Sequence, residues 1–376
     1  MIVVWDIPKV YLRSYRGVGE LRRRGTSNTQ SLTDAHEGRT GSTFLVGDSA
    51  PSVEFVDDDL TWSTGVGSAD ELARIDDPGT SVRSDPGGAV LRFTAIGTGW
   101  KIDTARPLPD GLRTRIVALC EDFDRVWSRF RTDSLVAAIA HAPGGGRFSF
   151  PARDTALLDL YDRLVAATAG AVDPLVGRAL ELLGYDADYT LIPDRAGLAD
   201  LAPASWSRDV RHEQTTIVTD RPLVIDVGAA GKGHLVDLIA QHLFDEGINE
   251  FLIDGGGDLR QSGPEPVVVA LQHPTRPGRA IGTVPLHNAA LCASATTRRT
   301  WGEGLQHVLD GRTGQPVSDV VATWALASDA ATADGLATAL FVSDPASLVA
   351  FEFSWVRMLV DGRVQWSNDF DGELFL

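Results

Sequence analysis

The chain has 376 residues, a formal net charge of −17 and two cysteines. Its length allows one large domain or two ordinary ones. The acidic balance argues against nucleic acid or an anionic membrane as the main partner, since both require a basic surface. No segment reaches the length of a transmembrane helix. Cys120 and Cys292 each lie in an apolar run, which predicts two buried free thiols.

Residues 1–88 differ in composition from the rest. A short strand is predicted over residues 2–5, and a tract rich in Ser, Thr, Gly and Asp follows later. Apolar residues are sparse and no period persists, so we expect an N-terminal extension that is largely irregular. The first residues lack the parts of a secretory signal, which predicts a cytoplasmic location, with membrane association only through a partner protein.

Periodic patterns begin at residue 89, where we expect the main domain, residues 89–376, to start. In chain order they predict a hairpin over 90–94 and 100–103, a helix over 112–127, a loop over 128–134, a helix over 157–165 ending at Gly170, a short helix over 173–184, and loop-like residues over 186–212.

The stretch from 222 to 263 has the most informative pattern. It predicts a buried strand over 223–227, a glycine-rich loop over 228–233 holding Lys232, and a helix closed by Gly247. A second strand, over 251–253, then enters a loop at 255–258. Loop amides and a helix N-terminus suit a polyanionic ligand.

Two better-known phosphate loops do not match this stretch. A Walker loop has Ser or Thr after its lysine, whereas Gly233 stands there, and a dinucleotide fingerprint has a third glycine where this chain has Val236. The alternative to a phosphate site is an ordinary strand–turn–helix whose glycines only serve the turn.

The remaining chain is rich in predicted strands, over 267–272, 282–286, 290–293, 306–309 and 320–326, followed by a helix over 329–342 and a hairpin over 357–360 and 364–366. This mixture predicts an α+β fold, not a regular βαβ alternation.

Two late features carry candidate chemistry. Asp334 and Thr338 stand at i and i+4 of the predicted helix, and their hard oxygens suit magnesium. The alternative is a solvated Asp and a Thr bonded to its own helix. His307 enters a turn and is a candidate general base, or a satisfied histidine at a strand end.

These signals occur in the order found in one family. Seven segments together resemble the motifs of the ApbE family of flavin transferases. They are Ala95-Ile-Gly-Thr98, Ser128-Arg-Phe-Arg131, Gly170-Ala-Val-Asp-Pro-Leu-Val-Gly177, Asp226-Val-Gly-Ala-Ala-Gly-Lys-Gly233, Gly256-Gly-Asp258, His307-Val-Leu-Asp-Gly-Arg-Thr-Gly314 and Ala333–Thr338. The resemblance covers about two-thirds of the chain, from residue 95 to 342.

The resemblance implies a mixed sheet core with flanking helices and an FAD cleft between two subdomains. It implies magnesium-dependent transfer of FMN from FAD to a threonine of an acceptor flavoprotein, with release of AMP. It assigns FAD contacts to Ile96, Phe130, Ala171, Val172, Asp173, Asp226, Lys232 and Val308, a magnesium site to the Ala229 carbonyl, Asp334 and Thr338, and catalytic roles to Lys232 and His307.

The chain departs from the family pattern at several positions. Ser294–Arg298 lacks the family's tyrosine and acid, His234 replaces a tyrosine, Ile96 a methionine and Leu175 a threonine. Two alternative functions therefore stay open beside the transferase: an FAD pyrophosphatase that yields FMN and AMP, and a non-catalytic FAD-binding protein.

Overall fold

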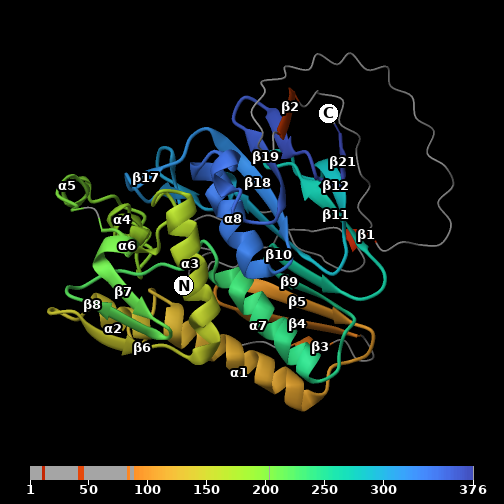
Figure 1. Ribbon diagram of the computed structural model, residues 1–376, viewed down its shortest axis with the longest axis horizontal. Coiled ribbons are helices and arrows are strands. Elements are labelled where there is room, and N and C mark those ends of the chain that lie inside the picture. The colour runs from red at the N-terminus through yellow and green to blue at the C-terminus, as the bar shows by residue number, and fades with distance from the viewer. Residues whose placement is uncertain (1–10, 13–40, 46–82, 85–88, 203, 376) are drawn as a thin grey trace.

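The computed structural model describes residues 11–12, 41–45, 83–84, 89–202 and 204–375. A ten-stranded sheet runs through the molecule (Figure 1). In spatial order its strands are β2 (Gly41–Leu45), β20 (Arg363–Ser367), β19 (Ser354–Leu359), β18 (Val320–Ala327), β13 (Ala290–Ala295), β10 (Asp258–Ser262), β9 (Phe251–Gly255), β5 (Thr98–Thr104), β4 (Val90–Ala95) and β3 (Arg83–Ser84).

Smaller sheets complete the β-structure. A four-stranded sheet has the order β1 (Tyr11–Leu12), β11 (Val267–Gln272), β12 (Ala280–Leu286) and β21 (Glu373–Leu374). The other three are β6 (Gly146–Ser149) with β8 (Thr216–Thr219) and β7 (Val210–Glu213), β14 (Thr300–Trp301) with β15 (Leu305–Gln306), and β16 (Leu309–Asp310) with β17 (Gln315–Pro316). Every ladder between the described strands is antiparallel, which is more uniform than the expected mixed sheet.

The α-helices of the described chain are α1 (Asp110–Trp127), α2 (Leu135–Ala140), α3 (Thr155–Ala167), α4 (Gly177–Leu182), α5 (Arg195–Ala199), α6 (Trp206–Asp209), α7 (Gly231–Asp245) and α8 (Ala330–Val342). Figure 1 shows α7 and α8 close to the strands of the central sheet, with α1 and α3 beside them. No helix within the described ranges is long and apolar enough to cross a bilayer.

Two apolar cores lie on opposite sides of the central sheet. One joins β4, β5 and β9 to α1, α3, α7 and α8, and its fully buried members include Ile102, Ile116, Leu164 and Ile239. The other lies between the central sheet and the four-stranded sheet and includes Leu259, Leu271 and Val356. The α+β class is confirmed, because helices and antiparallel strands form separate layers.

Several predicted elements are confirmed. The hairpin of β4 and β5 turns at Ile96 and Gly97, both with positive φ, and α1, α7 and α8 match the predicted helices. Asp329 caps α8 by accepting a hydrogen bond from the Thr332 amide. The two cysteines are buried free thiols, as predicted.

Other predictions were wrong. Leu223, Ile225 and Val227 are buried, but residues 223–227 form no strand. The Asp226 amide donates to the Pro174 carbonyl and not to a neighbouring strand. The helix that follows begins at Gly231, so Lys232 lies in its first turn and not in a loop. The predicted strand over 306–309 is two short strands, β15 and β16, and residues 186–212 contain α5, α6 and the start of β7.

Three segments of the N-terminal region are described, and each pairs at a sheet edge. They are β1 against β11, β2 against β20, and β3 against β4. The rest of the expected extension, with the strand expected over 2–5, lies outside the described residues.

Candidate functional site

The first half of the site lies where α7 and α8 pack together. Lys232 contacts the carboxylate of Asp258, a fully buried residue at the start of β10. The other oxygen of Asp258 has no hydrogen-bond partner in the described part of the chain. The contact with Asp258 holds the ammonium group of Lys232 in place, and the lysine side chain as a whole is 25% exposed.

The predicted metal-binding residues meet beside this lysine. The Thr338 hydroxyl donates to the Ala229 carbonyl at 3.4 Å, and the Asp334 carboxylate accepts from the Gly233 amide at 3.0 Å. Burial raises the pKa of Asp334, and the positive charge of Lys232 opposes that rise. The structure thus brings a carboxylate, a hydroxyl and a carbonyl together near one cation.

The close packing of the two helices requires glycine at position 233. A Cβ atom there would lie 2.1 Å from the Ala330 carbonyl oxygen and 2.8 Å from the Asp334 Cβ. Both neighbours are held in α8, so neither can move aside as a flexible side-chain end could. Gly233 therefore lets α7 approach α8 closely enough to bond Asp334.

The second half of the site centres on Asp226 and Arg129. Asp226 accepts from the Arg129 Nε at 2.6 Å and from the Gly228 amide at 2.7 Å. Burial alone would raise the pKa of Asp226, but the Arg129 charge and these hydrogen bonds hold it below its ordinary value. Asp226 is thus an ionised carboxylate that fixes Arg129 to the segment leading into α7.

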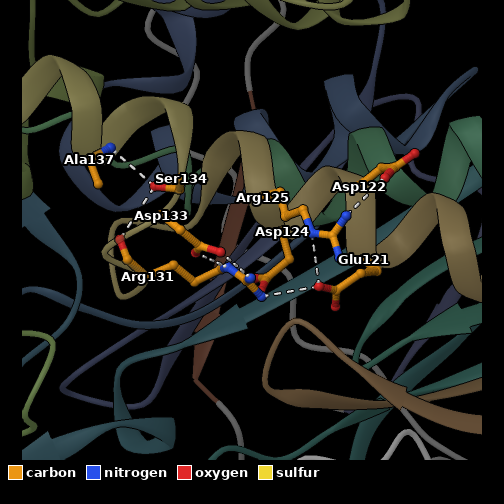
Figure 2. Close-up of polar contacts among 8 residues, drawn as sticks. All are labelled: Glu121, Asp122, Asp124, Arg125, Arg131, Asp133, Ser134 and Ala137. Carbon is orange, nitrogen blue, oxygen red and sulfur yellow. Dashed lines mark hydrogen bonds and ion pairs between the residues drawn. The ribbon is translucent and has the colours of Figure 1, made fainter.

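Arg129 and Phe130 lie on a loop that the next residue, Arg131, attaches to helix α1. Figure 2 shows the Arg131 guanidinium bonding Asp133 at 2.8 Å, Asp124 at 3.1 Å and Glu121 at 3.3 Å. Ser134 caps α2 by accepting from the Ala137 amide at 3.1 Å. These contacts tie both ends of the loop to α1 and α2, which fixes the direction of its side chains.

Aromatic rings gather around this loop. Phe130 stacks on Tyr189 with ring centroids 5.2 Å apart and meets Tyr185 edge-on at 5.5 Å. Tyr185 also stacks on Trp301, and its hydroxyl accepts from Arg299 at 2.9 Å. The predicted ring-binding residue Phe130 therefore belongs to an aromatic cluster formed by Phe130, Tyr185, Tyr189 and Trp301.

His307 lies near the same charges. Its Nδ1 is buried without a hydrogen-bond partner among the described residues, and burial together with the Arg299 charge lowers its pKa to about 3. At neutral pH the ring is therefore neutral and can accept a proton. A base with so low a pKa is weak, since general bases work best near the operating pH.

The segment 171–173 lies against the turn after His307. The Gly311 amide donates to the Ala171 carbonyl at 2.8 Å, and Ala171 and Val172 are buried. Both oxygens of Asp173 are engaged, by the amides of Leu175 at 2.8 Å and Trp206 at 2.9 Å. Asp173 therefore caps the turn at Pro174–Val176 in this structure.

The remaining two predicted contacts lie at the margins. Val308 is buried; its amide donates to the Gln306 side chain and its carbonyl accepts from Val317. Ile96 is half-buried at the tip of the first hairpin. That hairpin reaches the Gly256 turn, where a Cβ would lie 2.1 Å from the Thr98 hydroxyl oxygen, and so approaches Asp258.

The loop between Asp226 and Lys232 joins the two halves. The buried Tyr161 hydroxyl lies under this loop; burial raises its pKa, and the charges of Asp226 and Asp334 raise it further. Arg129, Tyr161 and Tyr189 were missed by the sequence analysis. Arg129 lies in the segment Ser128–Arg131, whose family motif is Ser-x-Tyr/Phe-Arg, and stands at the position that the motif leaves unspecified. Only long-range contacts reveal the other two.

One departure from the family pattern has a structural explanation. His234, in α7, lies 3.1 Å from the buried Asp154 carboxylate, whose second oxygen accepts from the Trp127 indole at 3.1 Å. Buried polar groups require such partners. His234 therefore forms part of a polar contact inside the core.

This fold is shared by a class of flavin transferase structures. A structure from Vibrio cholerae named flavin transferase ApbE is similar with a TM-score of 0.65 at 24% identity, over 74% of this chain and 96% of that one. The ApbE protein of Thermotoga maritima gives a TM-score of 0.66 at 26% identity, again over 74% of this chain and 96% of that one.

The chain belongs to the ApbE family, whose model matches residues 96–353. A relative from Klebsiella pneumoniae named FAD:protein FMN transferase is 28% identical over 280 residues, which are 68% of this chain and 79% of the relative. One of the same name from Rhodobacter capsulatus is 31% identical over 62% of this chain and 44% of its own length.

Proposed function

We propose that this chain is an FAD:protein FMN transferase that moves FMN from FAD to a threonine hydroxyl of an acceptor flavoprotein and releases AMP. Its family membership and the names of its relatives support the reaction class. The single observation that carries the proposal is the convergence of Lys232 with Asp334, Thr338 and the Ala229 carbonyl. In FAD a diphosphate links the flavin half to the adenosine half, and the proposed reaction breaks this diphosphate. A site that binds the diphosphate is therefore the feature that the reaction requires.

The donor set fits magnesium. Carboxylate, hydroxyl and carbonyl oxygens are hard ligands, and the raised pKa of Asp334 reflects a buried charge that a cation would stabilise. Asp334, Thr338 and the Ala229 carbonyl would hold the ion. When bound, magnesium supplies charge neutralisation at the diphosphate.

The chain's own residues have separate tasks in the proposed reaction. Lys232 contacts the diphosphate and offsets its negative charge, while Asp258 holds the ammonium group in position. The acceptor's threonine oxygen bonds to the FMN phosphorus, the bond from that phosphorus to the bridging oxygen breaks, and AMP leaves with that oxygen. His307 takes the threonine proton; the negative charge of a bound diphosphate would raise its pKa toward the range a base requires.

The second half of the site is proposed to hold FAD. Phe130 and Ile96 would contact its flavin or adenine ring, and the segment 171–173, Asp226 and the main chain at Val308 would supply further contacts. Asp226 is ionised and fixed, so it provides a constant acceptor at this position. The aromatic cluster supplies flat apolar surface of the kind on which ring systems stack.

The proposal is tested by incubating the protein with FAD, magnesium and candidate acceptor proteins. We expect AMP by chromatography and a flavin-fluorescent acceptor band on a denaturing gel, both lost when the acceptor's threonine is changed to alanine. AMP that forms equally without acceptor would instead identify an FAD pyrophosphatase.

The low pKa of His307 is the one observation that favours a second candidate, a non-catalytic FAD-binding protein. That candidate predicts tight FAD binding and no AMP at any magnesium concentration, with or without acceptors.

A further inference from the structure

The Arg129 guanidinium is buried with two of its nitrogens unused. Its side chain is 4% exposed, and its Nε donates to Asp226 at 2.6 Å. Neither Nη1 nor Nη2 has a hydrogen-bond partner among the described residues. Buried guanidinium donors are almost always satisfied in folded proteins, so a pair left open beside a candidate site indicates a missing acceptor.

The surroundings of Arg129 are flat and apolar. Its Cζ lies 4.2 Å from the centre of the Phe130 ring and 5.2 Å from that of Tyr185. The open donors therefore lie beside the aromatic cluster, with the guanidinium over the Phe130 ring. A ligand ring whose edge reaches the guanidinium can accept from these donors while its face packs on a neighbouring ring of the cluster.

The charge balance at this position separates two kinds of acceptor. Asp226 neutralises Arg129 at short range, so this ion pair by itself offers two N–H donors with little net positive charge. The charge of Arg299 also acts on Asp226, but the Arg299 guanidinium donates to the Tyr185 hydroxyl and is not part of the pair. A phosphate group is best matched by a net cation, as at Lys232, whereas neutral carbonyl oxygens require only donors. The pair therefore suits ring carbonyls better than the diphosphate.

We propose that Arg129 is a specificity-determining residue that donates to the carbonyl edge of the flavin ring of FAD. The inference rests on the proposed function for the identity of the ligand. The residue itself lies at the unspecified position of the Ser-x-Phe-Arg motif, so the assignment comes from its contacts in this chain.

Tyr189 packs next to this position. Its ring stacks on Phe130 at an interplanar angle of 5°, and the charges of Arg299 and Arg129 act on its hydroxyl. Tyr189 and Leu191 both have positive φ, 49° and 54°, which non-glycine residues rarely adopt. The Tyr189 ring must move aside for a flavin to reach the Phe130 face and the Arg129 donors.

The test is the variant Arg129→Lys, because lysine can still pair with Asp226 but loses the forked donors. Binding of FAD, riboflavin and ADP is measured by calorimetry for wild type and variant. We expect about a tenfold or greater loss of affinity for FAD and riboflavin, since each lost hydrogen bond in a buried site costs about that factor, and unchanged affinity for ADP. Arg178→Lys, a surface arginine paired with Glu181, is the matched control.

A loss of ADP affinity equal to that for FAD would overturn the inference in favour of recognition of the phosphates or of the adenine ring. Unchanged binding of all three ligands would also overturn it. If wild type binds FAD and Arg129→Lys shows the expected split while no AMP is ever formed, the proposed transferase fails and the inference stands. In an active enzyme the variant raises KM for FAD and leaves kcat unchanged, because the flavin ring takes no part in the bond change.

Discussion

Replacing Asp334 with asparagine separates a metal-binding role from a structural one. The Asp334 side chain is buried, accepts one amide hydrogen bond, and has a pKa raised by burial. Asparagine has nearly the same shape and keeps an acceptor for Gly233, but it removes a buried charge. Without metal, we expect the variant to be as stable as wild type or more stable, because the desolvation cost of the carboxylate disappears.

Magnesium should reverse that order. A ligand at a hundredfold excess over its Kd stabilises the native state by about 2.7 kcal/mol. A domain of this size gains about 2–4 °C in Tm per kcal/mol, so wild type should rise by roughly 5–10 °C. The asparagine variant loses the only carboxylate of the proposed oxygen set and should rise by less than about 1 °C.

The assay is thermal unfolding with and without magnesium, followed by AMP formation from FAD under the same conditions. Asp110→Asn, at a side chain 99% exposed in α1, is the control and should keep the full magnesium response. If Asp334→Asn retained the magnesium-dependent rise in Tm, the metal would bind elsewhere and the proposed site would be wrong.

Three further predictions concern the interior and its titrating groups. Gly233→Ala should cost about 3 kcal/mol or more in unfolding free energy and abolish activity, because its Cβ would meet the Ala330 carbonyl at 2.1 Å, whereas Gly144→Ala, in open space, should change neither. Burial raises the pKa of Cys120 to about 12, and Cys292 is also buried, so neither thiol should react with a thiol reagent at pH 8 until denaturant is added. Fast reaction in the native state would contradict the burial of these two side chains. The pKa of His307 is lowered from 6.5 to about 3, so between these two pH values the native state binds fewer protons than the unfolded state. The contribution of His307 to the free energy of unfolding is therefore fully present above pH 6.5 and is lost as the pH falls toward 3. Denaturant unfolding of His307→Gln should therefore depend less steeply on pH over that window, and identical slopes would refute the assignment.

Elements marked by both a period and an end signal were predictable from sequence. The periodic apolar residues of α1 and the Asp329 cap of α8 depend only on residues close in sequence, so the sequence alone predicts these elements correctly. Residues 223–227 failed for the opposite reason. Their apolar run correctly predicts the burial of Leu223, Ile225 and Val227. Whether a buried extended segment pairs with another strand depends on residues far away in sequence, and here the Asp226 amide bonds to Pro174.

The candidate site divides in the same way. Lys232, Asp334 and Thr338 stand in motifs, so the resemblance supplied them, and the structure places them close together. Arg129 was missed because the contacts that distinguish it are with Asp226, which is far away in sequence, and with an aromatic cluster whose residues come from several loops. The short helix α2 was also missed, although Ser134 carries a capping signal before it.

By pairing at sheet edges, β1, β2 and β3 cover backbone N–H and C=O groups that would otherwise be open to other chains. β2 and β3 close the opposite flanks of the ten-stranded sheet, and β1 closes one flank of the four-stranded sheet. A chain shortened to begin at residue 89 would leave the outward N–H and C=O groups of β20, β4 and β11 open to other molecules. Open strand edges recruit further strands, so loss of these three short segments should appear first as self-association and only later as lost catalysis.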